Sequence, residues 1–97
     1  MAELTTKSIS AENTFSDAVN LEGYFNISIS GTFVATVTVQ RSYDSGSTWH
    51  DVDSWTSPSE ETGFDPEFCL YRIGVKTGGY TSGTVNVRIG EEDREQH

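Results

Sequence analysis

The sequence predicts an all-β protein: a single small β-sandwich of about seven antiparallel strands, immunoglobulin-like or jelly-roll-like in architecture. Three observations predict this class. Apolar and polar residues alternate along several segments, turn residues separate those segments at short intervals, and no window of ten or more residues shows apolar residues at helical spacing. Short strands at such spacing are typical of sandwiches and small barrels.

The alternation places seven strands, near 14–19, 23–30, 33–43, 48–56, 60–64, 67–77 and 83–90. The clearest is the third, where β-branched residues are frequent and one face carries Phe33, Ala35, Val37 and Val39. Three other strands carry similar apolar series, namely Phe25, Ile27 and Ile29; Cys69, Tyr71, Ile73 and Val75; and Val85, Val87 and Ile89. These series predict the core, because alternate residues of a strand point to the same face of a sheet.

Turn residues lie between the expected strands. The segment Ser30-Gly31-Thr32 is expected to separate the second strand from the third, and 78–83 to form a longer hairpin loop. Pro58 and the Asp65-Pro66 pair are expected between strands, where a missing amide donor matters little. The chain reads as one domain, 1–97, with loosely attached ends near 1–12 and 91–97 because these ends carry little apolar pattern.

Composition and charge limit the possible functions. The chain has 97 residues, enough for one domain, and a formal net charge of −9. This acidity argues against binding to nucleic acid or to an anionic membrane surface. No apolar run approaches the roughly 18 residues of a membrane span, and the first residues lack the features of a secretory signal. We therefore expect synthesis in a reducing cytoplasm, where the single cysteine, Cys69, forms no internal disulfide.

The segment SYDSGSTW fits the Asp-box pattern S-x-D-x-G-x-T-W, which is known from sialidases. In this pattern Asp44 accepts hydrogen bonds from the following amides, and Gly46 supplies a positive φ. Thr48 is expected to begin the return strand and Trp49 to cover the hairpin that starts at Ser42. Sialidase-like enzymes also need several blades and an arginine cluster, so we interpret the motif as a structural turn.

The sequence offers no catalytic, cofactor or metal site. His50 and Asp51 are consecutive in one expected strand and therefore point to opposite faces. Cys69 has no adjacent basic residue that would activate its thiol, so we interpret it as a small buried hydrophobe. The acidic residues of the 51–67 segment form no recognisable calcium loop. We expect a protein that is not an enzyme.

Two runs carry a resemblance: GTFVATVTVQRSYDSGSTWHDVDSW and YRIGVKTGGYTSGTVNVRI. Over roughly Gly31 to Ile89 they resemble small β-sandwich proteins of tailed bacteriophages, in which a strand ending in Q-R-S leads into a D-x-G-x-T-W turn. The resemblance implies a virion component such as a capsid decoration protein, a head fibre or a tail accessory protein. Its expected partners are other virion proteins, such as major capsid or tail proteins, after synthesis in the cytoplasm of the bacterial host.

The expected contact residues are cationic and apolar. Four cations lie at outward positions or strand ends, and they would form one basic stripe if the third, sixth and seventh strands were neighbours: Arg41, Arg72, Lys76 and Arg88. In a homo-oligomer this stripe would meet the acidic 51–67 segment or the acidic tail of the next copy. The simpler interpretation is ordinary pairing across strands in solvent. Phe68 and Leu70 are candidate apolar contacts, with burial under a loop as the alternative.

A second candidate function is carbohydrate binding. Tyr80 is expected at the tip of a hairpin and Trp55 on the strand after the Asp-box, and either ring could stack on a sugar. The alternative for both rings is packing onto their own sheet. Under the carbohydrate-binding hypothesis the chain is a glycan-binding β-sandwich module instead of a purely structural part.

Overall fold

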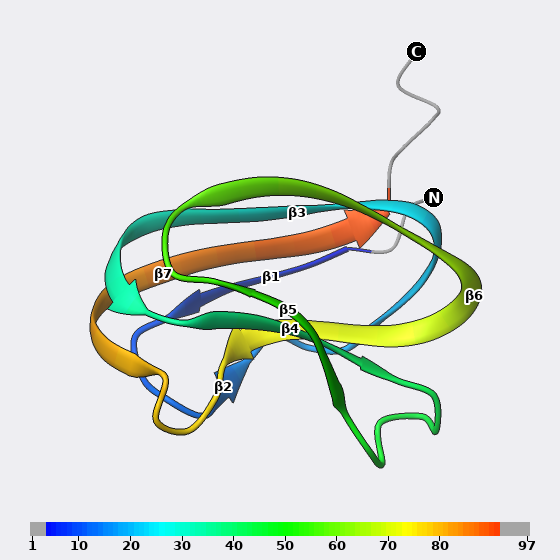
Figure 1. Ribbon diagram of the computed structural model, residues 1–97, viewed down its shortest axis with the longest axis horizontal. Coiled ribbons are helices and arrows are strands. Elements are labelled where there is room, and N and C mark those ends of the chain that lie inside the picture. Colours follow the sequence, from blue (N-terminus) through cyan, green and yellow to red (C-terminus); the bar gives the residue numbers. More distant parts are fainter. Residues whose placement is uncertain (1–3, 92–97) are drawn as a thin grey trace.

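The computed structural model describes residues 4–91, and every regular element in that range is a β-strand (Figure 1). This confirms the all-β prediction. The strands are β1 (Leu4–Ile9), β2 (Thr14–Phe15), β3 (Val19–Ala35), β4 (Val37–Ser42), β5 (His50–Trp55), β6 (Ser59–Val75) and β7 (Tyr80–Glu91).

The strands form one antiparallel sheet in the order β1-β7-β3-β6-β4-β5, with β2 paired to β6 outside this path. Two strands of 17 residues, β3 and β6, serve both layers of the sandwich. One layer contains β1, β7, the main part of β3 and the first half of β6; the other contains the start of β3, the second half of β6, β4 and β5. The strands pass between layers at a bulge, where the partner residue changes from Cys69 at Leu21 to Asp65 at Gly23.

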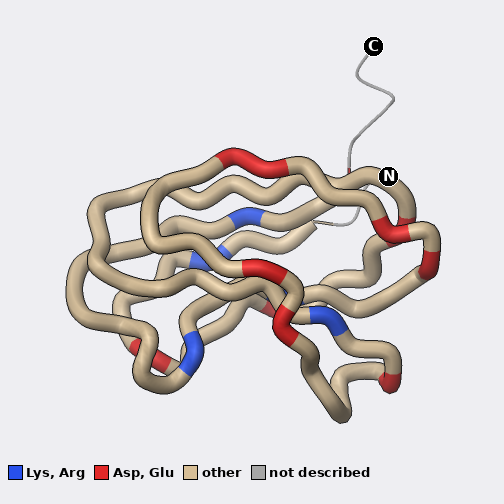
Figure 2. The backbone as a smooth tube through the Cα atoms, viewed as in Figure 1, with Lys and Arg blue, Asp and Glu red and all other residues tan. Residues whose placement is uncertain are grey.

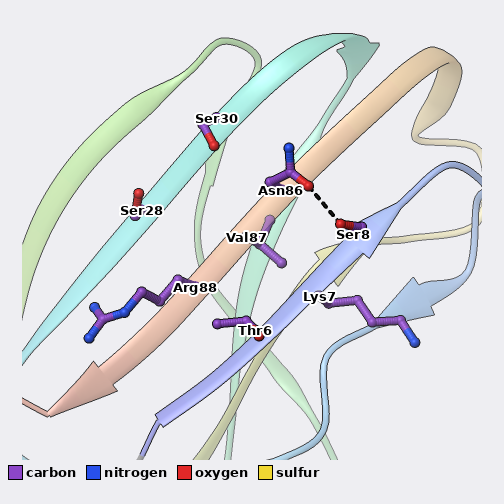
Figure 3. A pocket seen from close by; sticks show the side chains of 8 residues that line it. All are labelled: Thr6, Lys7, Ser8, Ser28, Ser30, Asn86, Val87 and Arg88. Carbon is purple, nitrogen blue, oxygen red and sulfur yellow. Dashed lines mark hydrogen bonds between the residues drawn. The ribbon is translucent and has the colours of Figure 1, made fainter.

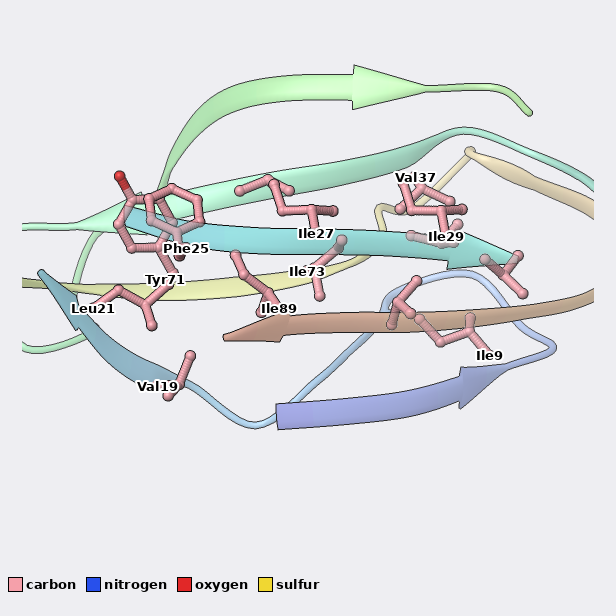
Figure 4. Close-up of a cluster of buried hydrophobic side chains, with 14 of the residues drawn as sticks. Ile9, Val19, Leu21, Phe25, Ile27, Ile29, Val37, Tyr71, Ile73 and Ile89 are labelled. Atoms are coloured by element: carbon pink, nitrogen blue, oxygen red, sulfur yellow. The ribbon is translucent and has the colours of Figure 1, made fainter. Parts of the chain in front are cut away.

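The core lies between the layers and consists of the alternating apolar residues (Figure 4). The series that share a face in the sequence are buried together, while Phe33 is partly buried at the margin. The rings of Phe25 and Tyr71 are tilted against each other with centroids 5.0 Å apart. Burying one large apolar side chain contributes about 1.5–3 kcal/mol, so these strands stabilise the fold mainly through this face.

The predicted turn at Ser30-Gly31-Thr32 is wrong, because β3 continues through it to Ala35. Gly31 has a φ of 106° and pairs with Val85 of β7, and a Cβ added there would collide with the carbonyl oxygen of Thr84. The glycine therefore serves a close approach between two strands. The chain leaves β3 later, at Thr36, whose amide donates a 2.7 Å hydrogen bond to the Gly79 carbonyl.

The expected break at Asp65-Pro66 is also wrong as a strand boundary, since β6 runs without interruption from Ser59 to Val75. The residues 66–68 have no partner on β3, because the pairing shifts across them. Pro66 therefore occupies a bulge, where its missing amide donor leaves no ladder bond unmade. Similarly, the expected strand at 14–19 is divided between the two-residue β2 and the start of β3.

The N-terminal end is not loosely attached over residues 4–9. These residues form β1, which pairs with β7 along its whole length, from Leu4 opposite Gly90 to Ile9 opposite Val85. Ile9 is fully buried in the core and anchors the strand. Residues 10–12 are exposed and belong to no strand, so the prediction for them agrees with the structure. At the other end Glu91 is the last residue of β7, and residues 1–3 and 92–97 of the two predicted loose ends lie outside the described residues.

Candidate functional site

The Asp-box segment forms a hairpin whose polar side chains bond to its own backbone. The buried Ser42 Oγ accepts hydrogen bonds from the amides of Gly46 (2.8 Å) and Asp44 (3.3 Å) and donates to Asp44 Oδ1 (2.8 Å). Asp44 Oδ1 also accepts from the Thr48 amide at 2.8 Å, and this bond, with that from Ser42, lowers the pKa of Asp44. Gly46 has the positive φ, 94°, that the motif requires. The expected start of the return strand at Thr48 is wrong: the Thr48 amide bonds to Asp44 within the turn, and β5 begins two residues later, at His50.

Trp49 lies over the hairpin, within van der Waals reach of a Cβ at Gly46, and also contacts Arg72. The Arg72 guanidinium lies 4.4 Å from the centre of the Trp49 ring and 4.1 Å from that of Phe15. Burial lowers the pKa of Arg72. An arginine held against two rings is part of the packing, so Arg72 is not the freely exposed interface cation that the sequence suggested.

Polar bonds extend this packing across the outer face of the second layer. Arg72 Nε donates to Gln40 Oε1 at 2.8 Å, and Gln40 Nε2 donates to Asp51 Oδ1 at 2.9 Å. Lys76 Nζ donates to the other oxygen of Asp51 at 2.6 Å, and these bonds lower the pKa of Asp51, with that from Lys76 contributing most. Two predicted contact cations thus share a network that pairs β4, β5 and β6 internally.

The Arg41 side chain is not part of this network and points toward the crossing of the layers. It lies opposite Tyr71 in the β4–β6 register and donates to the buried Asp65 carboxylate at 3.2 Å, while Tyr71 donates to the same carboxylate oxygen at 2.7 Å. The amide of Glu67 donates to the other oxygen at 2.9 Å. Burial acts to raise the pKa of Asp65, but these three donors together hold it below its usual value. Arg41 therefore stabilises the crossing between the layers.

Arg88 lies on the outer face of the first layer, beside Thr6 of β1 and Ser28 of β3. There it borders an open hollow of about 530 Å³ lined mainly by hydroxyl and amide side chains (Figure 3). Because β3 separates β7 from β6, the single basic stripe predicted from the sequence is wrong. In Figure 2 the basic segments of the backbone lie at separate places in the molecule and do not form one continuous stripe.

Three of the exposed aromatic residues lie near the crossing of the layers, and a fourth, Tyr43, lies in the Asp-box segment. Phe68, in the bulge of β6, is 65% exposed, whereas Leu70 is half-buried beside Gly46. Sequence reasoning missed Tyr24 and Phe64, which are 52% and 58% exposed and lie opposite each other in the β3–β6 register with ring centroids 4.8 Å apart. The available signal for Tyr24 was position, because it precedes the core residue Phe25 and therefore faces outward; Phe64 stands between Gly63 and Asp65 and had no such signal.

The two candidate sugar-stacking rings pack onto their own sheet. Trp55 lies opposite Val37 in the β4–β5 register, and both Trp55 and Tyr80 are partly buried against the core. The Tyr80 hydroxyl donates a 2.8 Å hydrogen bond to the carbonyl of Gly83, which holds the ring against its hairpin. Their own sheet therefore covers part of each ring, although Trp55 also lines a cavity between β5 and β6.

Within residues 4–91, no three histidine, cysteine, aspartate or glutamate side chains come together where they could hold a metal ion. The buried Cys69 thiol has a raised pKa, caused first by burial and then by the nearby Asp65 and Glu67 carboxylates. A raised pKa reduces the fraction of the nucleophilic thiolate at neutral pH.

The described part of the chain contains no helix that could cross a membrane.

The geometry is thus that of a β-sandwich with two ion pairs among the described residues, Arg41–Asp65 and Lys76–Asp51, and with three exposed aromatic rings near the crossing of the layers. Comparison of the chain with protein-family models, curated proteins and solved structures found no match.

Proposed function

We propose that this protein is a non-enzymatic virion structural protein of a tailed bacteriophage, a capsid decoration or other head or tail accessory component, that acts through protein–protein contacts. The resemblance of residues 31–89 to small phage β-sandwich proteins supports the class. The structural observation that carries the proposal is the exposure of three aromatic rings near the layer crossing, those of Tyr24, Phe64 and Phe68. Its partners are other virion proteins and further copies of itself.

Exposed aromatic rings favour a role in contact. Tyr24 and Phe64 form a tilted ring pair on the outer face of the first layer, and Phe68 is exposed in the adjacent bulge. Aromatic residues are enriched in the buried centres of protein interfaces, where each contributes strongly because it adds a large area at small entropic cost. The net charge of −9 on the chain favours solubility of the free protein while these rings are exposed to solvent.

Internal hydrogen bonding of the polar side chains supports the same role. The Asp-box hairpin, the Arg72 network and the Asp65 cluster bond their polar groups internally, so docking needs little rearrangement of the surface. A preorganised surface loses less conformational entropy on binding. The protein would therefore bind as a preformed block and add a layer of buried contacts to the shell or tail.

Quantitative mass spectrometry of purified particles, counting this protein against the major capsid protein, tests the proposal. We expect a fixed ratio, high for a shell component and low for a tail or neck component. Phe64→Ser and Phe68→Ser should each reduce the ratio. Val34→Ser is the control, because Val34 is as exposed to solvent as Phe64, and it should leave the ratio unchanged. Absence of the protein from particles would overturn the virion role, and carbohydrate binding, measured by tryptophan fluorescence, would then be the function to test.

A further inference from the structure

Two strand edges of the first layer are open among the described residues; β5, which pairs only with β4, is an open edge of the second layer. β1 stands at the end of the strand order and pairs only with β7, and the Ser59–Asp65 half of β6 pairs only with β3 within the described chain. Each open edge presents a row of backbone amides and carbonyls that can pair with another strand. The two edges lie on opposite sides of the same layer, since β7 and β3 stand between them.

The two edges carry opposite charges on their inner sides. Lys7 lies opposite the buried Val87, so it is on the core-facing side of β1, yet its side chain is exposed and points away from β7 (Figure 3). Glu61 lies opposite the buried Ile27, so it is on the core-facing side of β6, and it is also exposed. Neither forms a salt bridge with any of the described residues.

The edge of β6 opens onto a groove that fits a lysine side chain. A cavity of about 110 Å³ lies between β6 and β5, and the rings of Phe25 and Trp55 contribute to its apolar lining. Asp53 borders it from β5, opposite the buried Val39 and therefore on the inner side, and Glu61 borders it from β6. A lysine packs its aliphatic stem on apolar surface while its ammonium group reaches carboxylates at the rim.

We propose that β1 of one copy pairs with the Ser59–Asp65 half of β6 of a second copy, and that Lys7 enters the groove between Asp53 and Glu61. Residues that lie opposite each other in a ladder share a face, so the two inner-side charges meet when the edges pair. Pairing of like edges would bring Lys7 against Lys7 or Glu61 against Glu61, and such like-charge pairs are destabilising. The contact is therefore head-to-tail, and it closes into a ring or extends as a filament.

This inference deepens the proposed assembly role by naming the surface through which copies meet. Its test uses the purified full chain in solution without particles, so its failure is distinguishable from a failure of the virion role. Sedimentation velocity over a range of concentrations, at low and at high salt, measures self-association of the wild type, Lys7→Glu, Glu61→Lys and the double variant. Circular dichroism checks that each variant is folded.

We expect concentration-dependent association of the wild type that weakens with salt. Each single reversal should weaken it by about tenfold or more. The double variant should recover part of it, because Glu61 becomes cationic while Asp53 stays acidic. Lys76→Glu makes the same charge change on the other layer, where Lys76 pairs with Asp51, and should leave association unchanged. A wild type that stays monomeric up to millimolar concentration, a single reversal without effect, or a double variant without recovery would overturn the proposal.

Discussion

The hydroxyl of Tyr71 donates a 2.7 Å hydrogen bond to the carboxylate of Asp65, and both groups are buried where β6 crosses between the layers. Replacing Tyr71 by phenylalanine removes this donor and leaves the carboxylate with fewer partners. We expect a loss of about 1.5–3 kcal/mol in the free energy of unfolding, measured by urea denaturation. Tyr24→Phe is the control, because that ring is exposed, and it should change stability by less than about 0.5 kcal/mol.

Asp65 also makes stability depend on pH. Its pKa is lower in the folded protein than in the unfolded chain, so its contribution to stability is fully present above the unfolded-state value of about 4. The contribution is lost as the pH falls through the lower, folded-state pKa. The melting temperature of the wild type should therefore fall over this acid range more steeply than that of Asp65→Asn. Parallel curves for the two proteins below pH 4 would contradict the role given to this carboxylate.

The Asp-box hairpin depends on one buried hydroxyl. Ser42 Oγ accepts from the Gly46 and Asp44 amides, so Ser42→Ala leaves these donors without their acceptor. We expect the free energy of unfolding to fall by about 1–3 kcal/mol. Ser47→Ala, in the same turn but exposed, should be close to neutral. If the two variants prove equally stable, the bonds of Ser42 contribute nothing to the hairpin.

Arg72 and Lys76 should differ in thermal denaturation although the sequence grouped them as one kind of residue. Arg72→Lys keeps the charge but loses the planar contact with Phe15 and Trp49, and should cost about 1–2 kcal/mol. Lys76→Ala removes an exposed ion pair and should cost about 0–1 kcal/mol. A change in Trp49 fluorescence is expected for the Arg72 variant alone. Equal costs would mean that the stacking on the two rings is not stabilising.

Gly31 and Gly78 both have positive φ, but only Gly31 lies against another backbone. Gly31→Ala should lose about 2–4 kcal/mol, because the methyl group would collide with the Thr84 carbonyl as well as strain φ. At Gly78 nothing lies within 4 Å of an added Cβ, so Gly78→Ala should lose only about 1–2 kcal/mol. Denaturant midpoints of the two variants measure the difference, and a Gly31 variant as stable as the Gly78 variant would show that the strands can separate at little cost.

The sequence predicted the core well because alternation is a local property. Val37 and Val39 are buried as their positions indicate, and the class of the fold follows from such series. The boundaries failed where tertiary pairing overrides local signals. Gly31 resembles a turn residue in the sequence, but it is required by the close approach of β7. Pro66 resembles a strand break, but it lies in a bulge of β6.

The candidate site shows the same division. The Asp-box turn is encoded within one short segment, so Ser42 and Asp44 could be assigned roles from the sequence. The directions of Arg41 and Arg88 depend on strand order, which the sequence does not show, and so the basic stripe was wrong. Tyr24 and Phe64 are brought together only by the β3–β6 register. Because they are 40 positions apart, no local sequence pattern predicts that their rings are in contact.

The passage of β3 and β6 through both layers has a consequence for unfolding. Neither layer can detach while the other keeps its hydrogen bonds, because the same two strands belong to each. Hydrogen exchange at the centres of these strands should therefore occur only through opening of the whole molecule, and denaturation should follow a single cooperative transition. Pulling the two ends apart would load one continuous unit, so mechanical unfolding should also occur in a single step.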